Sequence, residues 1–68
     1  MKQGKLYLNE IGRYAIDEYT ELKSGDIVEV SLDDKNWLKT AIEHADYHGG
    51  YYATINPKMS LKGLYCRK

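Results

Sequence analysis

Hydrophobic and polar residues alternate along most of this chain with the two-residue period of β-strands. The clearest run covers residues 27–32. Val28, Val30 and Leu32 fall on one face of this run, and Glu29 and Ser31 fall on the other. Such alternation is typical of a strand in a sheet that has one buried and one solvated side. We therefore predict a strand over residues 27–32 with Val28, Val30 and Leu32 in the core.

Two shorter runs near the N-terminus predict a hairpin. Residues 6–8 alternate with their neighbours, and residues 13–16 can pair back against them. Residues 9–12, Asn-Glu-Ile-Gly, supply turn chemistry between the two runs.

The triplet Ser24-Gly25-Asp26 directly precedes the strand predicted at residues 27–32. Glycine can take a positive φ without steric cost, and the flanking Ser and Asp side chains can bond nearby amides. We therefore predict a sharp corner at Gly25 that turns the sheet.

Residues 37–44 have two possible interpretations. As a strand they would place Leu38, Thr40 and Ile42 on one face and Trp37, Lys39, Ala41 and Glu43 on the other. As a helix, residues 36–45 would be capped by Asn36. The strand is favoured, because turn signals at both ends give the spacing of a hairpin and the helical apolar stripe is short.

The last third of the chain alternates turn signals with strand signals. Gly49-Gly50 suits the tip of a hairpin over residues 45–50, and residues 51–55 form another β run. Asn56-Pro57 ends this run, since proline cannot donate a hydrogen bond to a sheet. Residues 59–63 are long enough for a single helical turn.

Residues 64–67 are the predicted closing strand, and alternation turns Leu64 and Cys66 inward. Five or six short strands with frequent turns in so short a chain predict an all-β, mainly antiparallel fold. An SH3-like, partly open barrel fits this pattern best. With 68 residues, the chain has room for one domain over residues 1–68.

Composition restricts the function classes. The chain has 10 Lys and Arg residues and 10 Asp and Glu residues, a formal net charge of zero. This balance gives no reason to expect bulk attraction to nucleic acid or to anionic lipid. One cysteine cannot form an internal disulfide, which favours a cytoplasmic location. We expect no signal peptide and no membrane span, because no apolar run approaches the required length.

Catalysis and metal binding have few candidate residues. Those with suitable chemistry are His44, Asp46, His48 and Cys66. A metal site needs three or four such ligands around one ion, whereas the two histidines are placed at a strand end and in a loop. Cys66 falls at an inward position, where thiols are usually inert. We therefore expect no enzyme activity, no metal and no cofactor.

Aromatic and basic residues on outward strand positions are the candidate binding residues. They are Trp37, Lys39, Tyr52, Tyr65 and Arg67. Such a set could form a hot spot for a protein partner, or could stack the bases of single-stranded nucleic acid. The same aromatics could instead complete a small core, because the chain has seven tyrosines and no phenylalanine. Zero net charge favours a protein partner, and we expect a monomer or weak homodimer.

Charge is segregated along the chain. Residues 17–34 hold seven acids against one lysine, a net charge of −6, and residues 58–68 hold four cations without an acid, a net charge of +4. These blocks could be complementary surfaces within one fold, or faces for charged partners. In the second case, a small regulator from a mobile element could use its acidic stretch to compete with DNA for a basic site.

Five motifs occur in a recognisable order: GRYAI, ELKSGDIVEV, NWLKTAIEH, YYATI and LKGLYCRK. Together, over residues 12–67, they resemble a family of short proteins from Gram-positive bacteria and their mobile elements, described as domain of unknown function 5348. The resemblance implies a compact β-fold and a home in phage or plasmid DNA. It implies no catalytic residue.

Overall fold

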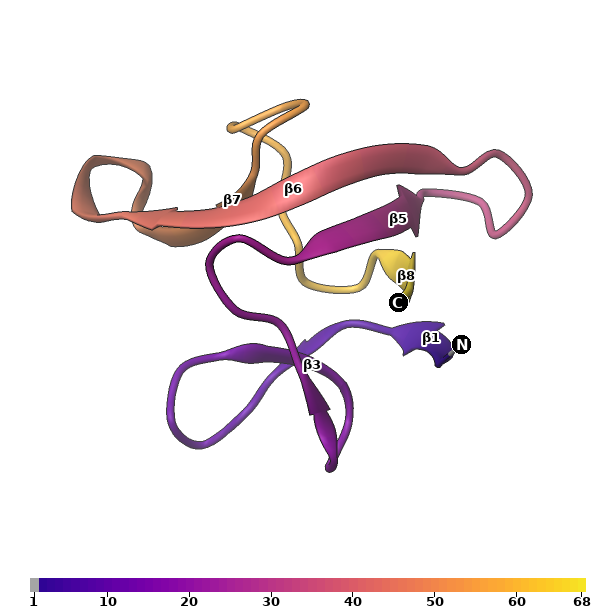
Figure 1. Ribbon diagram of the computed structural model, residues 1–68, viewed down its shortest axis with the longest axis horizontal. Helices are drawn as coiled ribbons and strands as arrows, with labels where there is room; N and C mark the ends of the chain where they lie inside the picture. Colours follow the sequence, from indigo (N-terminus) through magenta and orange to yellow (C-terminus); the bar gives the residue numbers. More distant parts are fainter. Residues whose placement is uncertain (1) are drawn as a thin grey trace.

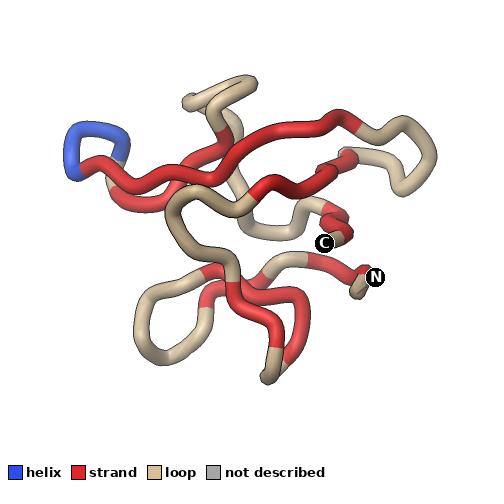
Figure 2. The backbone as a smooth tube through the Cα atoms, in the orientation of Figure 1, coloured by secondary structure: helices blue, strands red, loops and turns tan. Residues whose placement is uncertain are grey.

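The computed structural model describes residues 2–68, and in this part of the chain the regular elements are eight short strands and one 3₁₀ turn (Figures 1 and 2). The strands are β1 (Gln3–Lys5), β2 (Tyr7–Leu8), β3 (Tyr14–Asp17), β4 (Thr20–Glu21), β5 (Ile27–Ser31), β6 (Leu38–Ala45), β7 (Gly50–Ala53) and β8 (Tyr65–Arg67). The 3₁₀ turn η1 (Asp46–His48) lies between β6 and β7. The predicted all-β, mainly antiparallel class is confirmed, although the strands are more numerous and shorter than expected.

The strands form two antiparallel sheets. The larger has five strands in the order β1-β8-β5-β6-β7, and the smaller has three in the order β2-β3-β4. The two sheets do not close into a complete barrel, in agreement with the partly open arrangement predicted from the sequence. β8 lies between β1 and β5, so that the two ends of the chain lie side by side in Figure 1.

The longest strand, β6, joins two parts of the larger sheet. Its first half pairs with β5, from Val30 opposite Leu38 to Ile27 opposite Ala41. Its second half extends beyond β5 and pairs with β7. The alternative helix over residues 36–45 is therefore wrong. The spacing of turns on either side of this segment favours a hairpin, and the backbone hydrogen bonds of both neighbouring strands are satisfied only if it is extended.

The hydrophobic core draws on both sheets. Its members are Leu6, Ile16, Leu22, Val28, Val30, Ile42, Ala53, Leu61, Leu64 and Cys66. The sheets approach closely at Gly4 of β1, where a Cβ atom would lie 3.1 Å from Cγ2 of Ile16 in β3. The inward positions predicted for Leu64 and Cys66 are confirmed, since each is at most 3% exposed.

The predicted corner at Gly25 is confirmed. Gly25 has φ of +91°, and its amide donates to the carbonyl oxygen of Ile42 at 2.7 Å. The Asp26 carboxylate accepts from the Lys23 amide at 2.8 Å, which closes the turn. This corner joins the last strand of the smaller sheet to β5 of the larger one. The predicted hairpin near the N-terminus is also present, with Tyr7 opposite Ala15.

The predicted inward position of Leu32 is wrong. β5 ends at Ser31, and Leu32 is 80% exposed in the loop that follows. Ser31 is buried instead, because its hydroxyl donates to Asp33 at 2.9 Å and the local chain turns around that bond. Leu38 lies on the face that it shares with Thr40 and Ile42, opposite the buried Val30, but it is 53% exposed at the start of β6. Burial decreases where the β5–β6 hairpin leaves the sheet.

Two further differences concern residues 59–63 and the short strands β1 and β4. Residues 59–63 contain turns and no helix, since the chain there bends back from β7 toward β8. β1 and β4 were not predicted: β1 carries a central glycine, and β4 has only two residues. Neither is long enough to show an alternating pattern.

Candidate binding surface

The outer face of the larger sheet carries four of the five candidate binding residues. Strand register sets Gln3, Arg67, Glu29 and Lys39 in one row across β1, β8, β5 and β6. Tyr65 shares the face of Arg67, two positions earlier in β8, and Trp37 directly precedes β6. We call Trp37, Lys39, Tyr65 and Arg67, together with Glu29, the Trp37 face.

Arg67 is held from two sides. Its Nε and Nη2 atoms donate to the two carboxylate oxygens of Glu29 at 3.0 and 3.3 Å. Its guanidinium carbon also lies 4.2 Å from the centroid of the Trp37 ring. The bond from Arg67 holds the pKa of Glu29 below its ordinary value, and the charge of Lys39 adds to this effect. A bidentate pair stacked on an aromatic ring fixes the positions of all three side chains.

Tyr65 and Lys5 extend this face toward the edge of the sheet. The two residues lie opposite each other in β8 and β1, and the Lys5 ammonium lies 5.3 Å from the centroid of the Tyr65 ring. Tyr65 is half-buried, so part of its ring is open to solvent. A second aromatic and cation pair therefore lies beside the first.

Tyr52 lies apart from the other four candidates. It pairs with Glu43 in β6, four positions beyond Lys39, a separation of roughly 13 Å along a strand. Its ring packs 4.3 Å from that of His48, and burial raises its pKa. Tyr52 belongs to a small aromatic cluster around η1 that also includes Tyr47.

The histidines and the cysteine have structural contacts in this arrangement. The ring of His44 meets that of Tyr51 edge-on at 4.7 Å, and His48 contacts two tyrosines. Cys66 is buried in the core, and burial raises its pKa to about 11. Among residues 2–68, no group of three or more His, Cys, Asp or Glu side chains could hold a metal ion. No helix in this part of the chain is long and apolar enough to cross a membrane.

Two acids of the acidic stretch pair with the basic C-terminus. Besides the bond between Glu29 and Arg67, the Lys68 ammonium lies 2.9 Å from a carboxylate oxygen of Asp26. Burial opposes ionisation of Asp26, but the bonds from Lys68 and from the Lys23 amide are stronger together and lower its pKa. These contacts support the interpretation of the charge blocks as complementary surfaces within one fold. They do so for part of the acidic stretch only.

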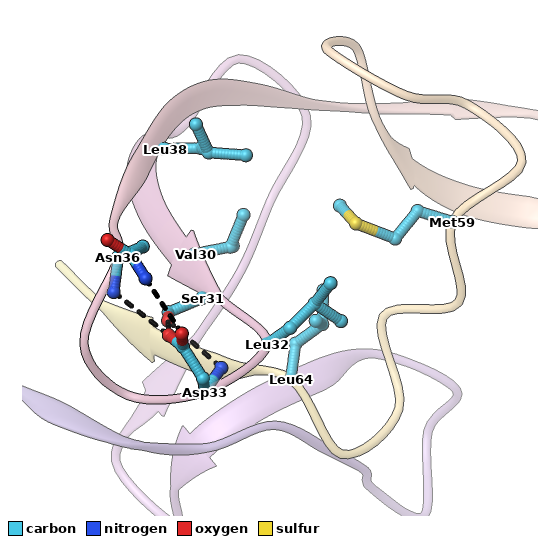
Figure 3. A pocket seen from close by; sticks show the side chains of 8 residues that line it. All are labelled: Val30, Ser31, Leu32, Asp33, Asn36, Leu38, Met59 and Leu64. Atoms are coloured by element: carbon cyan, nitrogen blue, oxygen red, sulfur yellow. Dashed lines mark hydrogen bonds between the residues drawn. The ribbon is translucent and has the colours of Figure 1, made fainter.

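An apolar pocket that the sequence did not indicate lies on the inner side of the β5–β6 hairpin (Figure 3). Its volume is about 190 Å³, and its lining residues are Val30, Ser31, Leu32, Asp33, Asn36, Leu38, Met59 and Leu64. In Figure 3 the side chain of Met59 points toward β5 from the opposite wall. Leu32, which breaks the predicted alternation, and Leu38 both form part of this pocket. The feature of the sequence that could have indicated this pocket is the position of these two leucines on either side of a polar loop.

The polar end of the pocket is built around one carboxylate. Asp33 accepts from the amides of Lys35 and Asn36, each at 2.9 Å, and from the Asn36 side chain at 2.8 Å. These bonds, with that from Ser31, hold the pKa of Asp33 far below its ordinary value. Asp34 takes the left-handed conformation with φ of +62°, which Asp and Asn tolerate better than most residues. The loop is thus fixed in one shape.

Comparison with known proteins identifies a family and no characterised relative. Searches among curated proteins and among solved structures give no match. The profile of one protein family, described as a domain of unknown function (DUF5348), matches residues 4–68. This match includes residues 4–5 of β1 and the hairpin that follows, which lie partly outside the region of the resemblance seen in the sequence. Because it covers nearly the whole chain, the protein belongs to the DUF5348 family.

Proposed function

We propose that this protein is a non-enzymatic binding module that recognises another protein through the Trp37 face. The observation that carries the proposal is the stack of Trp37 on Arg67, which Glu29 holds in place. Tryptophan and arginine are enriched among the residues that dominate protein–protein binding energies. Because their positions are fixed before binding, less conformational entropy is lost when a partner docks.

The charges of this face favour a protein partner over single-stranded nucleic acid. Glu29 lies in the middle of the row and pairs with Arg67, so the positive charge of Arg67 is already neutralised. Nucleic-acid binding draws most of its affinity from free cations that contact phosphates. Lys39, opposite Glu29 in the row, and Lys5, over the Tyr65 ring, are the features that favour the alternative function.

The biological setting is part of the same proposal. The resemblance to short proteins of Gram-positive bacteria and their mobile elements supports a phage, plasmid or bacterial origin. The single cysteine supports action in the cytoplasm. The partner would then be a bacterial or phage protein present in the same cell.

The proposal can be tested by capture from a lysate of the source organism. Immobilised wild-type domain is compared with Trp37→Ser and with Tyr19→Ser, a residue that is 85% exposed in the turn between β3 and β4. We expect one or a few proteins to be retained by the wild type and by Tyr19→Ser, and to be lost with Trp37→Ser. If every captured protein is retained equally by all three, or if none is retained, a binding role for the Trp37 face is contradicted. A thermal melt of each variant confirms that it is folded.

A further inference from the structure

The smaller sheet carries a second surface, which is separate from the Trp37 face. It is a hollow of about 510 Å³ lined by Tyr7, Leu8, Asn9, Glu10, Ile11, Asp17, Glu18 and Glu21. The lining comes from β2, from the β2–β3 loop, and from the β3–β4 hairpin. We call this feature the acidic hollow.

Three large apolar side chains of the acidic hollow are open to solvent. Tyr7 is 41% exposed, Leu8 is 52% exposed and Ile11 is 68% exposed. Single exposed apolar residues are ordinary on protein surfaces, but several around one concavity are typical of a binding site. The loop that carries Ile11 is closed by the Asn9 side chain, which accepts from the amides of Ile11 at 3.2 Å and of Arg13 at 2.9 Å.

The rim of the hollow has an excess of negative charge. Four of its lining residues are acids, and none is a cation. Asp17 has a partner in Lys2 at 3.6 Å, and Glu21 has one in Arg13 at 3.4 Å. Within residues 2–68, Glu10 and Glu18 make no ion pair. In this part of the chain, the unneutralised charge of the hollow is therefore that of Glu10 and Glu18, whereas Asp17 and Glu21 are paired.

We propose that the acidic hollow binds a Lys- and Arg-rich amphipathic segment of another protein. The apolar side chains of the segment would pack on Tyr7, Leu8 and Ile11, and its cations would face Glu10 and Glu18. Complementary charge would attract such a segment and would repel nucleic acid and anionic lipid. The segment would bind through its side chains, because β2 has only two residues and the adjacent Leu6 already exchanges backbone hydrogen bonds with Gly63 and Leu64. The domain thus has two separate binding surfaces.

The test uses a fluorescein-labelled peptide of twelve residues that alternates leucine and lysine. A serine–lysine peptide controls for charge alone, and a leucine–glutamate peptide controls for apolar contact alone. We expect binding of the leucine–lysine peptide at 50 mM salt, with an affinity at least roughly tenfold lower at 500 mM salt, because screening weakens exposed charge pairs. Amide shifts in a ¹⁵N spectrum should be confined to residues 7–11 and 17–21.

Two independent sets of variants locate the site. Glu10→Gln with Glu18→Gln removes charge, and Leu8→Ser with Ile11→Ser removes apolar surface; all four residues are exposed, so the fold is expected to persist. Each pair should lower affinity for the leucine–lysine peptide by at least roughly fivefold, and Glu43→Gln on the larger sheet should not. Equal binding of the serine–lysine peptide, or unchanged affinity in both double variants, would overturn the proposal. A wild-type dimer in sedimentation that Leu8→Ser with Ile11→Ser dissociates would also overturn it, since the occupant would then be a second copy.

Discussion

Acidic side chains and large apolar or aromatic side chains have different contacts on the two sheets. On the Trp37 face, Glu29 is paired with Arg67, and Arg67 is stacked on Trp37. In the acidic hollow, Glu10 and Glu18 have no ion partner within residues 2–68, and Leu8 and Ile11 are open to solvent. The side chains of the Trp37 face are held by contacts with one another, whereas Glu10 and Glu18 of the acidic hollow have no such ion pairs in the part of the chain that the structure describes.

The difference follows from strand length. In the larger sheet, cross-strand register places Glu29 between Lys39 and Arg67, so that opposite charges meet across neighbouring strands. β2 and β4 have two residues each, and they provide too few rows to bring a cation opposite every acid. Segregation of charge in a sequence therefore does not predict one charged face. The fold divides the acids according to the strands that carry them.

The largest expected effect tests whether the two sheets share one core. Ile42 of β6 is fully buried among side chains of both sheets. Ile42→Ala should lower the free energy of unfolding by about 2–5 kcal/mol, the range for deleting a large buried side chain. Urea unfolding followed by Trp37 fluorescence and by tyrosine absorbance should then give coincident, earlier transitions. Separate transitions would show that the two sheets unfold independently.

The next effect concerns the corner between the sheets. Gly25 has φ of +91° with no heavy atom within 4 Å of an added Cβ, so any cost of substitution is backbone strain. Gly25→Val should lower stability by about 1–3 kcal/mol, the scale for a strained backbone position. Ser24→Val in the same turn is the control. A thermal melt of Gly25→Val that matches the wild type would mean that residue 25 adopts an ordinary negative φ in solution.

The main strands were predictable because their alternation is long enough to read. Val28, Val30, Ile42 and Cys66 all lie at the inward positions that the two-residue period assigns to them. The corner was predictable from Gly25 with its polar neighbours. β1 and β4 were not, since two or three residues carry no period and their pairing depends on distant strands.

The sequence predicted which residues form the candidate surface better than it predicted how these residues contact one another. Alternation placed Lys39, Tyr65 and Arg67 outward, but it does not show that Arg67 lies opposite Glu29 or that its guanidinium lies over the Trp37 ring. Tyr52 also falls at an outward position, but it lies beside η1, away from the other candidates. Alternation shows which face a residue is on, and it does not show how far apart two residues lie along the sheet. Leu32 was misplaced, since the bond from Ser31 to Asp33 ends the strand one residue early.

The response to pH should depend on Asp33 more than on any acid of the hollow. Its folded-state pKa lies below the unfolded value, so its contribution to stability is fully present above about pH 4 and is lost as pH falls below it. Asp33→Asn should lower the melting temperature at pH 7 and flatten its decline between pH 5 and pH 2. The matched control is Asp34→Asn, because asparagine tolerates the φ of +62° there. Equal pH profiles for wild type and Asp33→Asn would contradict the assigned bonds.

The smallest expected effect on stability comes from the pair on the Trp37 face. Glu29→Gln should change the melting temperature little, because partly exposed ion pairs contribute little to stability. It should nevertheless alter Trp37 emission, since Arg67 loses the partner that holds it over the ring. Glu43→Gln, elsewhere on the larger sheet, should leave the emission unchanged. An unchanged spectrum in Glu29→Gln would show that Arg67 stacks on Trp37 without help from Glu29.

The most direct test of the protein-binding role uses Trp37 itself, the single tryptophan of the chain. Its emission is followed while the domain is titrated, at low salt, with the captured partner and separately with a fifteen-nucleotide oligothymidine. The partner should shift or quench the emission to saturation, and the oligonucleotide should leave it unchanged, because Arg67 already occupies one face of the ring and is neutralised by Glu29. Saturable quenching by the oligonucleotide, or partner binding that leaves Trp37 emission unaltered, would contradict the account.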